Sequence, residues 1–355
     1  MTTDTSGTLD EALERLHTAG PEFDGWLSNH GPMAVEALVR HGRSHRVHHW
    51  LDHYRARLDD MPSPYAPVTA ENWREALGDP RRLADWTLHF RRELAEHPWR
   101  TVLARWWPRL LPGIAGGATH PVIRVGHAVR TLLADEDGAG RGGAAPGGGS
   151  PRLAELAHAL GYWAARHQPL PRLARSTAPG PAGEALDAVA PVPDQSGGIR
   201  TRLAQLTSLP DWPDAAALTG PEDVRGALAE VVRAATHRYG SHAHGEPVML
   251  VHAATAPNAV LRTLPALPRE LWEPSLAAAW SAAAAVTAAY TPRDPLPPAR
   301  RREADAEEVF ERAAAHGDEH AIKFADTALD VASWGDDGRA LDAALRSVEL
   351  IPPLR

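Results

Sequence analysis

Apolar residues recur three and four residues apart through most of this 355-residue chain, which is the spacing of helices that bury one face. The pattern predicts helices over 9–19, 32–43, 44–58, 73–77, 83–97, 99–111, 120–134, 151–167, 221–239, 247–265, 272–290, 305–334 and 339–350. Alternation of apolar and polar residues, which is typical of half-buried strands, is not sustained over several segments. The sequence therefore predicts an all-α protein.

One low-complexity segment interrupts this pattern. Residues 136–150 read EDGAGRGGAAPGGGS, a composition that cannot bury enough apolar surface to order itself. We expect a disordered linker or a surface insertion there. Because candidate functional residues lie on both sides of it, we predict a single large multi-helix domain over 1–355 with a flexible Gly-rich insertion.

Composition excludes several classes of protein. The chain has no cysteine, so it can form neither disulfides nor thiolate metal sites. It has no apolar run of membrane-spanning length, and its net charge of −8 gives no electrostatic basis for binding nucleic acid. The polar residues 1–7 lead us to expect no signal peptide. We expect a soluble, cytoplasmic protein without nucleic-acid or membrane partners. The sequence does not indicate an oligomeric state.

Lys323 is the only lysine among 37 basic residues, and the other 36 are arginines. A GC-rich coding background explains the arginines, so a remaining lysine suggests chemistry that arginine cannot perform. A buried lysine can lose its proton and then serve as a base, form a Schiff base, or take up carbon dioxide as a carbamate. His320 precedes Lys323 by three residues, so the two share a helix face. The alternative is a solvated helix face with an incidental lysine.

Histidine is abundant, with 19 residues, and a chain without cysteine must bind a transition metal through imidazole and oxygen ligands. His30 stands at a predicted helix start, and His252 lies in an apolar stretch. His120 and His127 are seven residues apart on one helix face with Arg124 between them. A lone histidine on an apolar face is more often a core residue than a ligand. The densest histidine cluster, over 41–53, is interpreted mainly as a polar helix face.

Four segments, taken in order, resemble the questin oxidase-like family. They are NHGPMAVEALVRHGR from Asn29, THPVIRVGHAVR from Thr119, VMLVHAATAP from Val248 and GDEHAIKFADTALD from Gly317. The resemblance extends from about Asp10 to Leu354. That family includes fungal enzymes that oxidatively open anthraquinone rings.

The resemblance implies an α-helical fold and a mononuclear non-haem iron held by four histidines and a carboxylated lysine. Carried onto this chain, the ligands are His30, His120, His252, His320 and Lys323, with Lys323, His127 and Arg124 as candidate catalytic residues. The fungal pattern has a second histidine where this chain has Arg124, and tends to have tyrosine at His127. Whether His120 or His127 is the ligand therefore stays open.

The expected function is that of a non-haem iron-dependent oxygenase that cleaves a ring of an aromatic, anthraquinone-like polyketide. Its cofactors would be Fe(2+) and carbon dioxide as the lysine carbamate, and its partners an aromatic small molecule and dioxygen. One alternative is a metal-independent Baeyer–Villiger-type oxidase that uses NADPH, with Lys323 as a base. The other is a non-catalytic helical protein that binds a natural product.

Overall fold

The computed structural model describes residues 5–139, 149–171, 175–176, 181–209, 212–213, 223–297 and 303–354. Nearly all its elements are helices, so the predicted all-α class is confirmed. Contacts divide the chain into two compact units. Unit 1 contains residues 1–169 and 262–269, and unit 2 contains residues 170–261 and 270–355. The Gly-rich segment falls inside unit 1, and the expectation of one continuous domain stays a prediction.

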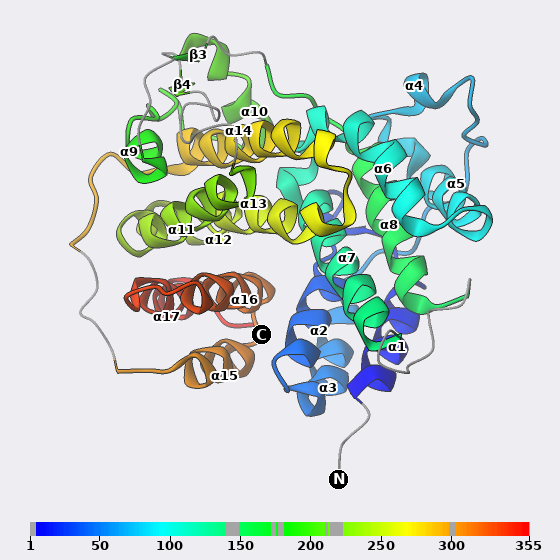
Figure 1. Cartoon of the computed structure of the whole chain (residues 1–355), viewed down its shortest axis with the longest axis horizontal. Coiled ribbons are helices and arrows are strands. Elements are labelled where there is room, and N and C mark those ends of the chain that lie inside the picture. The colour runs from blue at the N-terminus through cyan, green and yellow to red at the C-terminus, as the bar shows by residue number, and fades with distance from the viewer. Residues whose placement is uncertain are drawn as a thin grey trace. The chain divides into compact units, whose positions relative to one another are not determined.

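Unit 1 is built from helices and one short hairpin. Its elements are α1 (Thr5–Leu16), β1 (Glu22–Phe23), β2 (Leu27–Ser28), α2 (Gly31–Arg40), α3 (Ser44–Arg55), α4 (Trp73–Ala76), α5 (Leu83–Glu96), α6 (Trp99–Leu110), α7 (His120–Ala139) and α8 (Pro151–Ala165). Helix α8 packs against both α5 and α7, and α2 packs against α1, α3 and α7 (Figure 1). The antiparallel pair of β1 and β2 ends at Ser28, two residues before His30.

Helices α5 and α8 approach closely because α8 carries a glycine at their contact. A Cβ on Gly161 would lie 2.8 Å from the backbone nitrogen of Thr87, which is closer than real Cβ contacts allow. Aromatic rings fill the surrounding core, where Trp86 stacks on Phe90 and Trp107 meets Trp163 edge to face. Large rings beside a glycine allow two helices to interlock without voids.

Unit 2 contains mainly roughly parallel helices (Figure 1). Its elements are β3 (Arg175–Ser176), α9 (Ala182–Asp187), α10 (Ile199–Leu203), β4 (Trp212–Pro213), α11 (Val224–His242), α12 (Pro247–Leu250), α13 (His252–Thr263), α14 (Trp272–Tyr290), α15 (Ala306–His316), α16 (Glu319–Ser333) and α17 (Arg339–Leu350). Strands β3 and β4 pair in parallel. Helix α11 packs against α14, α16 and α17, and α15 packs against α16 and α17.

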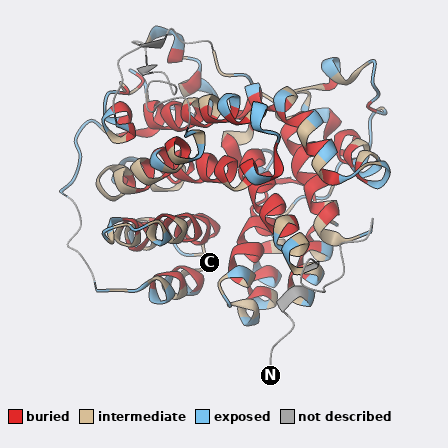
Figure 2. Ribbon diagram, in the orientation of Figure 1, coloured by how far each residue is buried: buried red, intermediate tan, exposed pale blue. Residues whose placement is uncertain are grey.

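Helix α14 is apolar on all sides, and Figure 2 shows it buried along most of its length. Its sequence, WEPSLAAAWSAAAAVTAAY, consists largely of alanine, which forms helices well and lets neighbours approach closely. Helices at the surface, such as α17, alternate buried and exposed faces instead. No helix in the described residues is long and apolar enough to cross a membrane.

Three predicted segments are corrected by the structure. The helix predicted over 305–334 is two helices, because Gly317 adopts a left-handed φ of 83° that ends α15, and Asp318 caps α16. The helix predicted over 247–265 is broken at Val251 into α12 and α13. Helix α7 continues to Ala139, so the first four residues of the predicted linker are helical. Residues 140–148 of that linker lie outside the described residues.

Candidate metal centre

Unit 1 brings His30 and His120 together. His30 is the residue before α2, its backbone N–H donates to the Tyr54 hydroxyl at 2.6 Å, and its side chain is buried. The ring centroids of His30 and His120 are 4.4 Å apart and the rings are nearly perpendicular. One ring nitrogen of each lies within 4.8 Å of the other, which is close enough for both to bind one ion.

An unusual turn sets the position of His120 at the start of α7. Gly117, Ala118 and Thr119 all have left-handed backbones, with φ of 52°, 53° and 67°. For a residue with a Cβ this conformation costs about 1 kcal/mol or more, so the surrounding fold must hold the turn in place. The turn directs the Gly117 carbonyl at His120 Nδ1, 2.6 Å away. Because a carbonyl only accepts, Nδ1 carries the proton and Nε2 has the lone pair that a metal requires.

His127 lies seven residues, or two helical turns, after His120 on α7, and the buried carboxylate of Glu36 holds its ring. Its Nδ1 donates to Glu36 Oε2 at 2.7 Å, and Arg130 Nε donates to Glu36 Oε1 at 3.0 Å. Burial lowers the pKa of His127, although Glu36 opposes that shift. Burial alone raises the pKa of Glu36, but Arg130 and His127 together bring it down to about 2. His127 is therefore a neutral imidazole beside a carboxylate anion.

Arg124, the third candidate on α7, forms a buried ion pair with α8. Its Nε and Nη2 donate to the two carboxylate oxygens of Glu155, at 2.5 and 2.8 Å. His17 Nε2 contacts the same carboxylate at 2.9 Å. This fork joins α7 to α8 through two of the five N–H donors of Arg124, and its buried Nη1 has no hydrogen-bond partner among the described residues. The predicted catalytic role of Arg124 stays a prediction.

Unit 2 brings His252 and His320 together. His252 is fully buried at the start of α13, and its Nδ1 donates to the Met249 carbonyl at 3.0 Å, so Nε2 carries the lone pair. Burial lowers the pKa of His252 well below its usual value, and the charges of Lys323 and His320 act in the same direction. His320 is the second residue of α16, with its ring centroid 5.7 Å from that of His252. One ring nitrogen of each lies within 4.8 Å of the other.

Lys323 lies one turn after His320 on α16, as the sequence predicted, and its side chain is fully buried. Its Nζ has no hydrogen-bond partner among the residues that the structure describes, which is costly for an ammonium group in an apolar interior. Burial lowers its pKa to about 7, against the opposing charges of Glu319 and Asp318. A substantial fraction of Lys323 is therefore a neutral amine at neutral pH.

These features fit a transition metal. Two buried pairs of histidines occur, one in each unit, and in each pair one ring is oriented by a backbone carbonyl behind its Nδ1. Neutral, oriented imidazoles are typical of metal ligands, and an unpartnered buried amine beside one pair is available for conversion to an anionic oxygen ligand. The residues could also serve as a buried polar core, but an unpartnered Nζ has no structural purpose there.

Three charged residues of these networks were missed by the sequence analysis. Glu36, Arg130 and Glu155 are buried and hold His127 and Arg124 in place. Glu36 is the one charged residue among the buried residues of α2, and this is the signal by which the sequence could have indicated it. Apart from the local contact of Arg130 with His127, their partners are 31 to 138 residues away, so those pairings could not be predicted.

Comparison with protein families matches residues 27–132 to the family described as questin oxidase-like. The recognition made from the sequence is confirmed over that range, which contains His30, His120, Arg124 and His127. The resemblance of the later segments, with His252, His320 and Lys323, stays a prediction. A comparison with curated proteins found no match.

Proposed function

We propose that this chain is a non-haem iron oxygenase that oxidatively cleaves a ring of an aromatic polyketide. The family match over 27–132 suggests an oxygenase that acts on polyketides. The observation that carries the finer proposal is the buried Nζ of Lys323, which lacks a hydrogen-bond partner and shares a helix face with His320. A permanent positive charge without a counter-charge would be costly at this buried position, whereas a lysine carbamate could bind the metal.

The proposed ligands are His30, His120, His252, His320 and Lys323, all bound to one iron. His120 is preferred to His127 because the ring centroids of His120 and His30 are 4.4 Å apart and one nitrogen of each ring lies within 4.8 Å of the other, whereas His127 groups with Glu36 instead. Iron held in this way would supply the redox chemistry that activation of dioxygen requires. His120 and His252 each present Nε2, because a backbone carbonyl holds the proton on Nδ1.

Lys323 contributes the only anionic ligand in this proposal. Its neutral amine attacks carbon dioxide, a C–N bond forms, and one proton leaves to solvent as the carbamate anion is completed. The product carries one negative charge in place of a neutral amine and offers oxygen to an otherwise all-nitrogen ligand set. Burial of Nζ favours this reaction because it destabilises the competing ammonium form.

The first test measures iron in the purified protein together with the oxidation of an anthraquinone-type substrate. We expect one iron per chain in the wild type, and loss of iron in both His30→Gln and His252→Gln. His53→Gln, an exposed histidine on α3, is the matched control and should keep its iron. Wild-type protein that oxidises substrate with NADPH but holds no iron would instead establish the metal-independent alternative. Ligand binding without oxygen uptake would establish a binding protein.

The second test addresses the carbamate. Lys323→Arg keeps a positive charge but cannot be carboxylated, so we expect it to lose both iron and activity. Because a buried arginine could also disturb folding, Lys323→Ala with added formate or acetate provides a second readout. A small carboxylate that enters the vacated volume should restore part of the iron content. A wild-type protein without a carbamate signal after labelling with ¹³C-bicarbonate would contradict this part of the proposal.

A further inference from the structure

A groove on unit 1 lies between the face of α5 and the chain segment that precedes α4. It has a volume of about 410 Å³ and is open to solvent, which is the size of a small-molecule site. One wall is the segment 64–67, which contains two prolines, and the other is a helix face with Leu88, Arg92 and Ala95 at spacings of four and three. None of the candidate metal ligands lines this groove.

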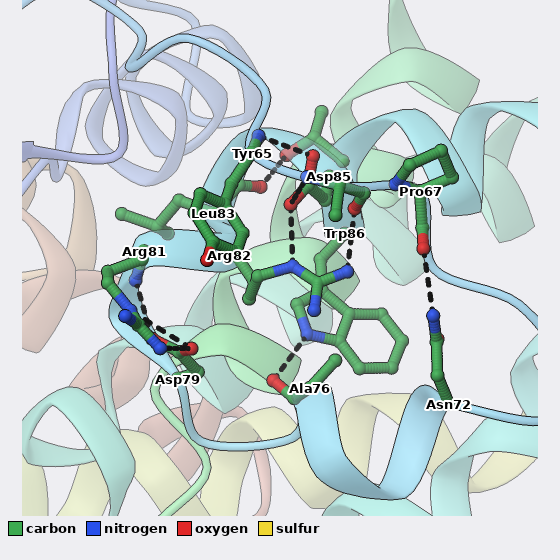
Figure 3. A network of polar contacts seen from close by, with 12 residues as sticks. Tyr65, Pro67, Asn72, Ala76, Asp79, Arg81, Arg82, Leu83, Asp85 and Trp86 are labelled. Carbon is green, nitrogen blue, oxygen red and sulfur yellow. Dashed lines mark hydrogen bonds and ion pairs between the residues drawn. The ribbon is translucent and has the colours of Figure 1, made fainter.

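The wall formed by residues 64–67 is held rigidly from behind. The backbone N–H groups of Tyr65 and Ala66 each donate to Asp85 at 2.9 Å, one to each carboxylate oxygen (Figure 3). Arg82 links the two walls, since its Nε donates to Asp85 and its Nη2 to the Ala66 carbonyl, both at 2.6 Å. With the ring constraints of Pro64 and Pro67, this network fixes the groove before any ligand arrives.

The groove presents apolar surface that a folded chain usually hides. The Tyr65 side chain is 66% exposed and Leu88 is 45% exposed, which places both among the few large apolar residues of the described chain that face solvent. The guanidinium groups of Arg81 and Arg82 lie 5.3 and 5.9 Å from the Tyr65 ring centroid. Contacts of this kind hold the ring in one orientation, as a stacking platform for a flat ligand.

The charge of the groove is positive, in a chain whose net charge is −8. Arg82 neutralises Asp85, and Arg81 pairs with Asp79 at 2.7 Å, so neither leaves an excess charge. Arg91 and Arg92, which also line the groove, form no ion pair with any described side chain. Two uncompensated guanidinium groups beside exposed apolar surface are suited to a carboxylate that carries an aromatic ring system.

We propose that this groove is a binding site for a flat aromatic carboxylate, with the rings against Tyr65 and Leu88 and the carboxylate on Arg91 and Arg92. The site goes beyond the proposed oxygenase reaction and does not depend on it. It would accept an aromatic acid either as a regulatory ligand or as a compound held before or after a reaction elsewhere.

Calorimetric titration with 2-naphthoate, and with the uncharged 2-naphthamide, tests this proposal on the full chain. We expect saturable binding of naphthoate that weakens as salt is raised, and at least about tenfold weaker binding of the amide. Arg91→Gln/Arg92→Gln should weaken naphthoate binding by about tenfold and leave amide binding unchanged. Tyr65→Ala should weaken the binding of both compounds.

The matched control is Arg200→Gln, an exposed arginine on α10 in unit 2, which should bind naphthoate like the wild type. Iron content is measured in parallel and should be the same in the groove variants and the wild type, so failure of the iron proposal would leave this test intact. Naphthoate binding that the arginine pair does not affect, or no saturable binding at millimolar concentration, would overturn the proposal.

Discussion

At the residue scale, unit 1 depends on carboxylates that are ionised although they are buried. Burial alone raises the pKa of Glu155, yet the Arg124 guanidinium and the contact with His17 bring it down to about 2. The folded state therefore prefers the ionised form more strongly than the unfolded chain does. The resulting stability is fully present above pH 4.5, the usual glutamate value, and is lost as pH falls from about 4.5 to about 2.

Glu155→Gln tests this contribution. The variant leaves Arg124 charged and buried without a counter-charge, so its free energy of unfolding at neutral pH should be lower by roughly 3 kcal/mol. It should also lose stability less steeply than the wild type between about pH 5 and pH 3.5. Urea denaturation at neutral pH measures the first effect, and urea denaturation across the acidic range measures the second.

Glu14→Gln, an exposed carboxylate on α1, is the control and should change stability by less than about 0.5 kcal/mol. Parallel pH profiles for Glu155→Gln and the wild type would show that the ion pair does not account for the acid sensitivity.

Single residues were predicted from the sequence with uneven success, for a physical reason. Lys323 could be identified because one residue type is used once, and composition alone reveals that. Its pairing with His320 is local, since three residues on a helix fix the geometry. The pairing of Glu36 with Arg130 spans 94 residues, and only the packing of α2 on α7 brings them together.

At the scale of the element, helix limits were predicted well where the ends are marked locally. The predicted limits of α14 and α17 agree with the structure at Trp272–Tyr290 and Arg339–Leu350. The break between α15 and α16 was missed, although Gly317 followed by Asp318 is a typical end and start of helices. The helical spacing of apolar residues continues across that break, and the prediction of one helix followed this spacing and not the capping residues.

The contact between α5 and α8 yields a prediction about a glycine. Alanine at position 161 would favour the helix by about 1 kcal/mol, but its Cβ would approach Thr87 Oγ1 at 2.9 Å and the Thr87 backbone nitrogen at 2.8 Å. Because backbone cannot move aside cheaply, we expect Gly161→Ala to lower the unfolding free energy by about 1–3 kcal/mol.

Gly240→Ala on α11 is the matched control for that variant. No atom lies within 4 Å of the added Cβ, so only the helix preference remains and the variant should gain about 0.5–1 kcal/mol. Denaturation curves of the two variants should therefore shift in opposite directions. A shift in the same direction would show that backbone preference, not the close approach of α5 and α8, decides the outcome at position 161.

At the scale of the whole molecule, a metal that binds only the folded chain must add to its stability. For a ligand at a hundred times its dissociation constant the gain is about 2.7 kcal/mol, because the unfolded chain does not share the binding energy. Buried histidine pairs and an unpartnered Lys323 Nζ are the features of this chain that a bound ion would relieve. Stability should therefore report metal binding without any assay of activity.

Removal of iron by a chelator, followed by dialysis, should lower the Tm of the wild type by about 2–5 °C, and reloading with ferrous iron under anaerobic conditions should restore it. His252→Gln should show a single Tm that neither treatment changes, whereas His53→Gln should respond like the wild type. Differential scanning calorimetry measures all three proteins. The Met249 carbonyl holds the proton on Nδ1 of the buried His252, so only Nε2 of this residue can bind a metal, and the substitution removes it. An equal response of His252→Gln and the wild type would therefore show that the metal binds elsewhere.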